Sequence, residues 1–140
     1  MISLRLVLDT NVIVSAAIFP AGMQHSVFLP AITKPARLYV SHEILQEYAG
    51  VLAQPRFRIL KLSRLQLLQT IQNESQLIVP KRRLAVAVDP DDDKFIECAE
   101  RARADYLITG NTRDFPERWR NTKIVNSRDF MTIVAPHLVR

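Results

Sequence analysis

The stretch LRLVLDTNVIVSAAI, residues 4–18, places a carboxylate and an amide inside an otherwise aliphatic run. Its first five residues have the apolar character of a short buried strand, and residues 12–17 are predicted to be helical. Asp9 therefore stands between the end of a strand and the start of a helix. A carboxylate there can cap the helix. It can also belong to a functional site, because parallel sheets bind ligands at the carboxyl ends of their strands.

Strand-like and helical segments alternate along the rest of the 140 residues. Further strands are predicted at 37–40, 76–79, 105–109 and 123–125. Further helices are predicted at 26–32, 42–53, 63–74, from the acidic turn 89–93 to about 103, and at 127–134, with a turn at 20–22 and N-caps at Ser41 and Ser63. This alternation and the chain length predict one α/β domain, residues 1–140, with a parallel sheet covered on both faces.

The composition excludes several classes of protein. With 48% hydrophobic and 24% charged residues, the chain resembles ordinary globular proteins. It lacks a window of about 18 apolar residues and a secretion signal, so we expect a cytoplasmic protein without a membrane partner. One cysteine excludes an internal disulfide and a cysteine-rich metal site. The three glycines form no phosphate-binding loop, and the three histidines have no paired metal spacing.

The net charge of +5 bears on the partners of the chain. Basic side chains gather near residues 56–64, at 81–83 and between 113 and 128. Many soluble proteins are basic for solubility alone, but a basic surface also attracts polyanions, which favours a nucleic-acid partner. The candidate residues for RNA contact are Arg82, Arg83, Arg113 and Arg118.

Helix phase indicates which acids face the strand ends. In the helix after Ser41, Glu47 lies at the edge of the apolar stripe, whereas Glu43 lies toward solvent. In the helix after residue 90, Asp92 begins an i, i+3, i+4, i+7 apolar face, and Asp93 is rotated away from it by about 100°. We therefore expect Glu47 and Asp92 to face the strand ends.

Three carboxylates at one rim, Asp9, Glu47 and Asp92, repel one another and need protons or cations. Each alone could be a helix cap or an ion-pair partner. Together they suit Mg²⁺ or Mn²⁺, which prefer oxygen ligands and can activate water against a phosphodiester. An aspartyl-phosphate phosphatase with Asp9 as nucleophile is less favoured, because Asn11 occupies the second position after it and no suitably placed lysine is evident.

Three sequence blocks resemble PIN-domain proteins, and more narrowly the toxin component of bacterial toxin–antitoxin pairs. They are VLDTNVIVSA at 7–16, VSHEILQEYAGVLAQPRF at 40–57 and DPDDDKFIECAERARADYLITGNTRDF at 89–115. The resemblance implies a three-layer α/β/α sandwich with a mainly parallel central sheet. It also implies a Mg²⁺- or Mn²⁺-dependent endoribonuclease acting on RNA, a cognate antitoxin that blocks it, and a homodimer.

The resemblance also implies a set of site residues. Many relatives carry an aspartate directly after T-G, where this chain has Asn111; another version of the motif fits TGNTRDF and makes Asp114 the fourth acid. The implied catalytic and metal-binding acids are Asp9, Glu47, Asp92 and Asp114. The implied orienting residues are Asn11, Ser15, Thr109 and Asn111.

Two other functions remain open from the sequence. A protein with this fold could bind nucleic acid with weakened or lost catalysis, and Asn111 favours that alternative because its amide adds no charge. A DNA nuclease could use the same acidic site. The small size and the lack of inserted DNA-gripping segments favour RNA.

Overall fold

The computed structural model describes residues 3–19 and 22–138, and within these ranges it contains a six-stranded sheet in the order β3-β2-β1-β4-β6-β5. The strands are β1 (Arg5–Leu8), β2 (Arg37–Val40), β3 (Ser75–Leu77), β4 (Tyr106–Ile108), β5 (Arg118–Trp119) and β6 (Thr122–Val125). All neighbouring strands pair in parallel except β5 and β6, which form an antiparallel edge. The predicted mainly parallel α/β sheet is confirmed.

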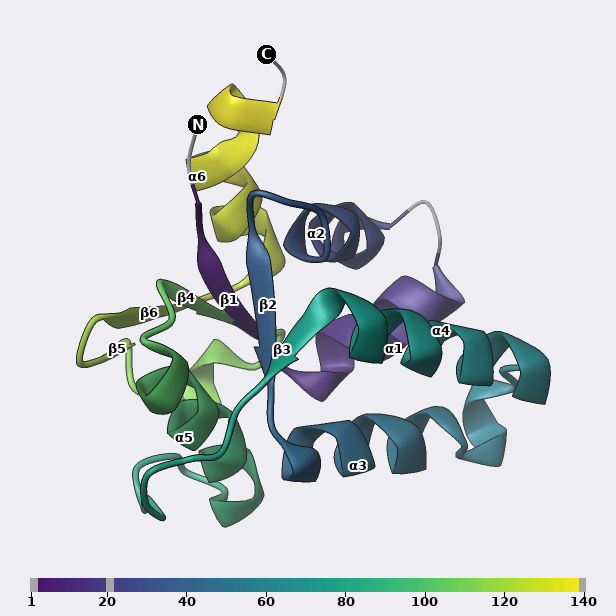
Figure 1. The fold of residues 1–140 in the computed structure, drawn as a ribbon, viewed down its shortest axis with the longest axis horizontal. Helices are drawn as coiled ribbons and strands as arrows, with labels where there is room; N and C mark the ends of the chain where they lie inside the picture. Colours follow the sequence, from purple (N-terminus) through teal and green to yellow (C-terminus); the bar gives the residue numbers. More distant parts are fainter. Residues whose placement is uncertain (1–2, 20–21, 139–140) are drawn as a thin grey trace.

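The helices lie on both sides of this sheet. They are α1 (Thr10–Ile18), α2 (Met23–Ala31), α3 (His42–Leu52), α4 (Lys61–Glu74), α5 (Asp93–Ala102) and α6 (Ser127–Leu138), with short 3₁₀ turns η1 (Pro55–Phe57), η2 (Pro90–Asp92) and η3 (Thr112–Asp114). Helix α5 packs against β1, β2 and β4, whereas α1 and α2 pack together on the other side of the strands (Figure 1). Among the helices described, none is long and apolar enough to cross a bilayer.

Most element boundaries follow the predictions, but several differ; α2, for example, begins three residues before the predicted residue 26. The Ser41 cap is confirmed, because its Oγ accepts a hydrogen bond from the Ile44 amide at 3.3 Å. The Ser63 cap is wrong, because α4 begins two residues earlier and its N-cap, Leu60, provides no side-chain hydrogen bond. The short strand β5 was not predicted, and α6 extends beyond residue 134. Residues 20 and 21 of the predicted turn lie outside the described ranges.

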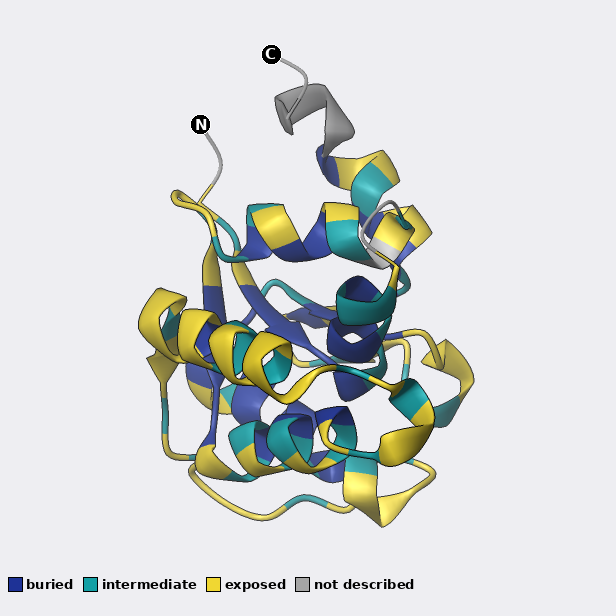
Figure 2. Ribbon diagram, turned by 90° about the vertical axis from the view of Figure 1, so that its right-hand side faces the viewer, coloured by how far each residue is buried: buried dark blue, intermediate teal, exposed yellow. Residues whose placement is uncertain are grey.

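The hydrophobic core surrounds β1, where Leu6, Val7 and Leu8 are fully buried between β2 and β4 (Figure 2). Tyr48 on α3 is also fully buried, and its hydroxyl donates a hydrogen bond to the carbonyl oxygen of Leu8. This bond ties α3 to the last residue of β1. The chain therefore fixes α3 against the strand end that precedes Asp9.

We expect Tyr48→Phe to lower the free energy of unfolding by about 1–2 kcal/mol, because it leaves a buried carbonyl without its donor. Urea unfolding monitored by circular dichroism measures the change. Tyr39→Phe is the matched control: Tyr39 is also buried, but its hydroxyl makes no hydrogen bond to any described residue. Equal losses in the two variants would contradict a role for the Tyr48 hydrogen bond.

Candidate active site

The carboxyl ends of β1 and β4 lie side by side, at the point where the strand order reverses direction. The Asp9 amide donates to the Ile108 carbonyl at 2.9 Å, so the residue that follows β1 is paired with the end of β4. Thr109 follows β4 directly. In open α/β sheets this position is where ligands bind.

Asp9 is held at this rim by two hydrogen bonds. One carboxylate oxygen accepts from the Thr10 amide and the other from the Thr109 hydroxyl, both at 2.7 Å. Asp9 is only 5% exposed, and it is also the N-cap of α1. Burial raises the pKa of the Asp9 carboxyl above its usual value, although the hydrogen bonds from Thr109 and Thr10 oppose this rise. The side chain of Asp9 therefore does both things that the sequence allowed: it caps α1, and it lies at the ends of β1 and β4.

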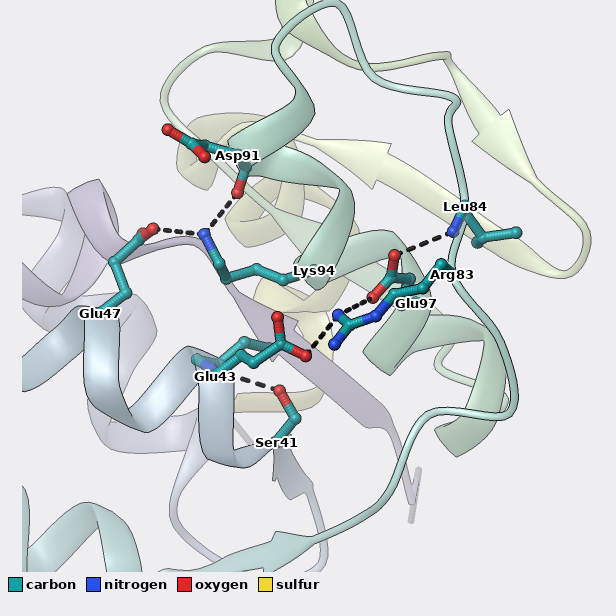
Figure 3. A network of polar contacts seen from close by, with 9 residues as sticks. Ser41, Glu43, Glu47, Arg83, Leu84, Asp91, Lys94 and Glu97 are labelled. Carbon is teal, nitrogen blue, oxygen red and sulfur yellow. Dashed lines mark hydrogen bonds and ion pairs between the residues drawn. The ribbon is translucent and has the colours of Figure 1, made fainter.

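Glu47 reaches the same rim from α3 and contacts both a hydroxyl and an ammonium. Its Oε2 accepts a hydrogen bond from the Thr10 hydroxyl, and its Oε1 accepts one from the Lys94 ammonium at 2.7 Å. Lys94 also donates to the Asp91 carbonyl at 2.5 Å, so its ammonium lies between α3 and η2 (Figure 3). Lys94 was not predicted to be part of the site.

Asp92 lies in η2 and is half-buried. Burial, and after it the negative charges of Asp9, Asp89, Asp114 and Glu47, together raise its pKa to about 7. These charges act on Asp92 only because the structure brings the acids near one another. All four predicted acids therefore contribute to one electrostatic cluster, and Asp89 adds a fifth carboxylate that sequence reasoning did not assign.

The predicted orienting residues lie around these acids. Asn11 Oδ1 accepts from the Gly110 amide at 3.1 Å, which joins α1 to the loop after β4. A Cβ atom at Gly110 would lie 3.3 Å from the Asn11 amide nitrogen, so the close approach favours glycine there. The Thr109 hydroxyl, which binds Asp9, accepts from the Asn111 amide at 3.0 Å. Ser15 lies further along α1, and within the described ranges its side chain forms no hydrogen bond.

One prediction about the helix phase is wrong. Asp93 was expected to turn away from the core-facing side, but it is buried, and its Oδ1 accepts from the amides of Val86 and Ala87 at 2.9 and 2.8 Å. Helix α5 begins at Asp93 and a 3₁₀ turn precedes it, so a helical phase counted from Asp92 does not apply. The segment before η2 covers the side of α5 on which Asp93 lies.

The four arginines predicted to contact RNA lie in different places. Arg82 forms two hydrogen bonds with Glu100, at 2.8 and 3.1 Å. Arg83 pairs with Glu43 at 2.6 Å and with Glu97 at 3.4 Å (Figure 3). Arg113 and Arg118 are exposed, in η3 and at the start of β5. Only Arg113 neighbours a predicted acid in the chain.

The donor set suits a hard cation in its chemistry. Within residues 3–19 and 22–138, no three histidine, cysteine, aspartate or glutamate side chains are arranged to bind one metal ion together. Yet the rim collects carboxylates that raise the pKa of Asp92, and the Lys94 ammonium provides Glu47 with a cationic partner. Oxygen ligands with a surplus of negative charge are those that Mg²⁺ and Mn²⁺ prefer. The oxygen donors therefore fit a divalent cation in their chemistry, and Glu47 is paired with Lys94 in this structure.

Known proteins resemble the chain in sequence and in fold. The sequence profile described as PIN domain matches residues 5–113. An uncharacterized protein of Methanocaldococcus jannaschii, MJ1680, is 31% identical over 118 residues, which cover 79% of this chain and 72% of that protein. The crystal structure of VapBC2 from Rickettsia felis bound to a DNA fragment from their promoter has a similar fold. Its TM-score is 0.60 at 17% identity, over 87% of this chain and 98% of that chain.

We expect the stability gained by Asp92→Asn to grow between pH 5 and pH 8 in the presence of EDTA. With a pKa of about 7 in the folded protein, Asp92 takes up a proton that the unfolded chain releases near pH 3.9. The folded protein thus binds more protons between these values, and wild-type stability falls as the pH rises through this window. Asparagine has no ionisable carboxyl group, so the variant does not lose stability in this way. Because Asp92 is partly exposed, screening limits the increment to about 1 kcal/mol.

Urea unfolding at the two pH values measures this increment. Asp91→Asn is the matched control, because Asp91 is exposed and precedes Asp92 in the same turn. It should change stability equally at both pH values. A gain from Asp92→Asn that is independent of pH would contradict the raised pKa of Asp92.

Proposed function

Because the chain belongs to the PIN-domain family, we propose that it is a metal-dependent endoribonuclease that hydrolyses RNA phosphodiester bonds. The observation that carries the proposal is the cluster of acids at the carboxyl ends of β1 and β4, where burial and the neighbouring carboxylates raise the pKa of Asp92. The net charge of +5 of the whole chain suits a polyanionic substrate.

In this proposal Asp9, Glu47 and Asp92 hold Mg²⁺ or Mn²⁺, with assistance from Asp114. The bound cation supplies an activated water and neutralises charge on the phosphodiester. The Thr10 amide and the Thr109 hydroxyl hold the Asp9 carboxylate in one orientation. The Asn11 amide fixes the loop that carries Asn111.

We further propose that the chain is the toxin of a toxin–antitoxin pair, that it forms a homodimer and that it acts in the cytoplasm. The resemblance of the three sequence blocks to such toxins supports this assignment. The similar fold of VapBC2 from Rickettsia felis agrees with it. Co-purification of the chain with the product of a small adjacent open reading frame, and loss of RNA cleavage in that complex, test the antitoxin partner.

Asp9→Asn should lower Mn²⁺-dependent cleavage of single-stranded RNA by at least about 100-fold, because it removes a charged ligand from the rim. Asparagine caps helices as well as aspartate does, so the fold and the melting temperature should be retained. Cleavage of a labelled RNA is measured with Mn²⁺ and with EDTA. EDTA-resistant cleavage, or full activity of Asp9→Asn, would contradict the proposed reaction.

Asn111→Asp should bind Mn²⁺ about tenfold more tightly than the wild type, because it adds a carboxylate at the position where many relatives carry one. Titration calorimetry measures the affinity and the number of ions bound. Asn121→Asp is the matched control, because it adds the same charge at an exposed turn between β5 and β6. Equal effects of the two substitutions would show that only net charge matters.

A further inference from the structure

We propose that a basic cleft at the C-terminal end of α5 binds phosphate groups of the RNA outside the cleavage site. The cleft has a volume of about 470 Å³, and its charged lining residues are Lys81, Arg82, Glu100, Arg103 and Arg120. Helix α5 has ten residues, so about 15 Å separates its two ends. The acids of the rim lie at the N-terminal end, and the basic cleft is therefore a separate site.

Charge and geometry both suit a phosphate ligand. Among the described residues, four cationic side chains line the basic cleft against one carboxylate, that of Glu100. All four cationic residues are exposed, so a ligand can reach them. Guanidinium groups bind phosphate oxygens through paired N–H donors, and three of the four cations are arginines.

Glu100 holds two of the arginines in fixed positions. Its Oε1 accepts from Arg82 Nη2 and from Arg120 Nε, both at 2.8 Å, and from the indole of Trp119 at 3.3 Å. The Glu100 side chain is only 9% exposed, and the hydrogen bond from Arg82 is the main reason that its pKa falls to about 2. Arg120 uses only its Nε in this contact, and its terminal amino groups make no hydrogen bond to any described residue, so both can bind a ligand. Glu100 thus acts as the half-buried anchor of an arginine pair.

The backbone gives an independent reason to assign a function to these side chains. Arg103 and Arg120 have φ values of 52° and 53°, in the left-handed region that favours glycine. Arg103 follows the end of α5, where glycine is the usual residue. Both positions carry arginine in spite of the steric cost. Strained residues that gather at one cleft are typical of functional sites.

The identity of the ligand as RNA rests on the proposed function, whereas the phosphate chemistry rests on the basic cleft itself. The test is the binding of a single-stranded RNA of about 20 nucleotides with a 5′-fluorescein label. Fluorescence anisotropy is measured in EDTA, so neither metal nor cleavage enters. Lost cleavage with intact binding would therefore count against the nuclease and not against the basic cleft.

The first variant is the double substitution Arg103→Gly and Arg120→Gly, because glycine suits both backbone conformations. We expect the dissociation constant to rise about tenfold at moderate salt. We also expect the slope of log K against log salt to become shallower by about 1.4, because each lost phosphate contact on a single strand contributes about 0.7. Lys81→Gln with Arg103→Gly should weaken binding in the same direction, and it leaves the contacts of Glu100 intact.

The matched control combines Arg58→Gly with Arg56→Ala. Arg58 also has φ of 52°, and both residues are exposed near η1, outside the basic cleft. This control removes the same charge and should change the dissociation constant less than twofold. Equal losses in the control and the cleft variants would overturn the proposal, because binding would then depend on total charge alone. Unchanged RNA binding in both cleft variants would also overturn it and leave an acidic protein as the ligand to test.

Discussion

The burial of the Asp9 carboxyl is the constraint on which the rest of the site depends. Placing an ionisable group at 5% exposure beside a fully buried strand is costly unless the group is hydrogen-bonded. The Thr10 amide comes from the helix that Asp9 caps, and the Thr109 hydroxyl comes from the end of β4. Satisfying one carboxylate therefore aligns α1 with the neighbouring strand. The Asn11–Gly110 hydrogen bond repeats that link one step further along the chain.

The same constraint explains how Lys94 and the second acid are used. The Thr10 hydroxyl donates to Glu47, and the Thr10 amide donates to Asp9. The negative charge of Glu47 also disfavours the ionised form of Asp9. The Lys94 ammonium compensates Glu47, and its charge also favours the ionised form of Asp9. One ammonium cannot balance the five carboxylates of this cluster, and burial together with the neighbouring negative charges raises the pKa of Asp92. Such an excess of negative charge favours the binding of a divalent cation, because the cation relieves the repulsion among the carboxylates.

The positions of Asp9 and Thr109 could be predicted from the sequence, because both directly follow short buried strands whose carboxyl ends must meet in a parallel sheet. Glu47 could be predicted from its place beside the apolar stripe of one helix. Lys94 could not, since its partner lies 47 residues away on another helix and periodicity says nothing about such pairs. Asp93 was misjudged for a related reason: its burial depends on the irregular segment before η2, whose path no repeat pattern describes.

That irregular segment, residues 83–88, runs alongside α5 from its C-terminal half to its first residue. Its amides at Leu84, Val86 and Ala87 donate to Glu97 and Asp93 on α5, and the Val88 amide donates to the carbonyl of Asp114 at 2.9 Å. The segment thus lacks regular structure but is fixed by buried acids. At one end it holds η3 near the acidic rim, and at the other it leads from Arg82 in the basic cleft. Asp93 and Glu97, which lie outside the proposed metal site, fix this segment along α5. The length of α5 sets the spacing between the acidic and the basic surfaces. If RNA spans both, this spacing determines which bond along the strand reaches Asp9.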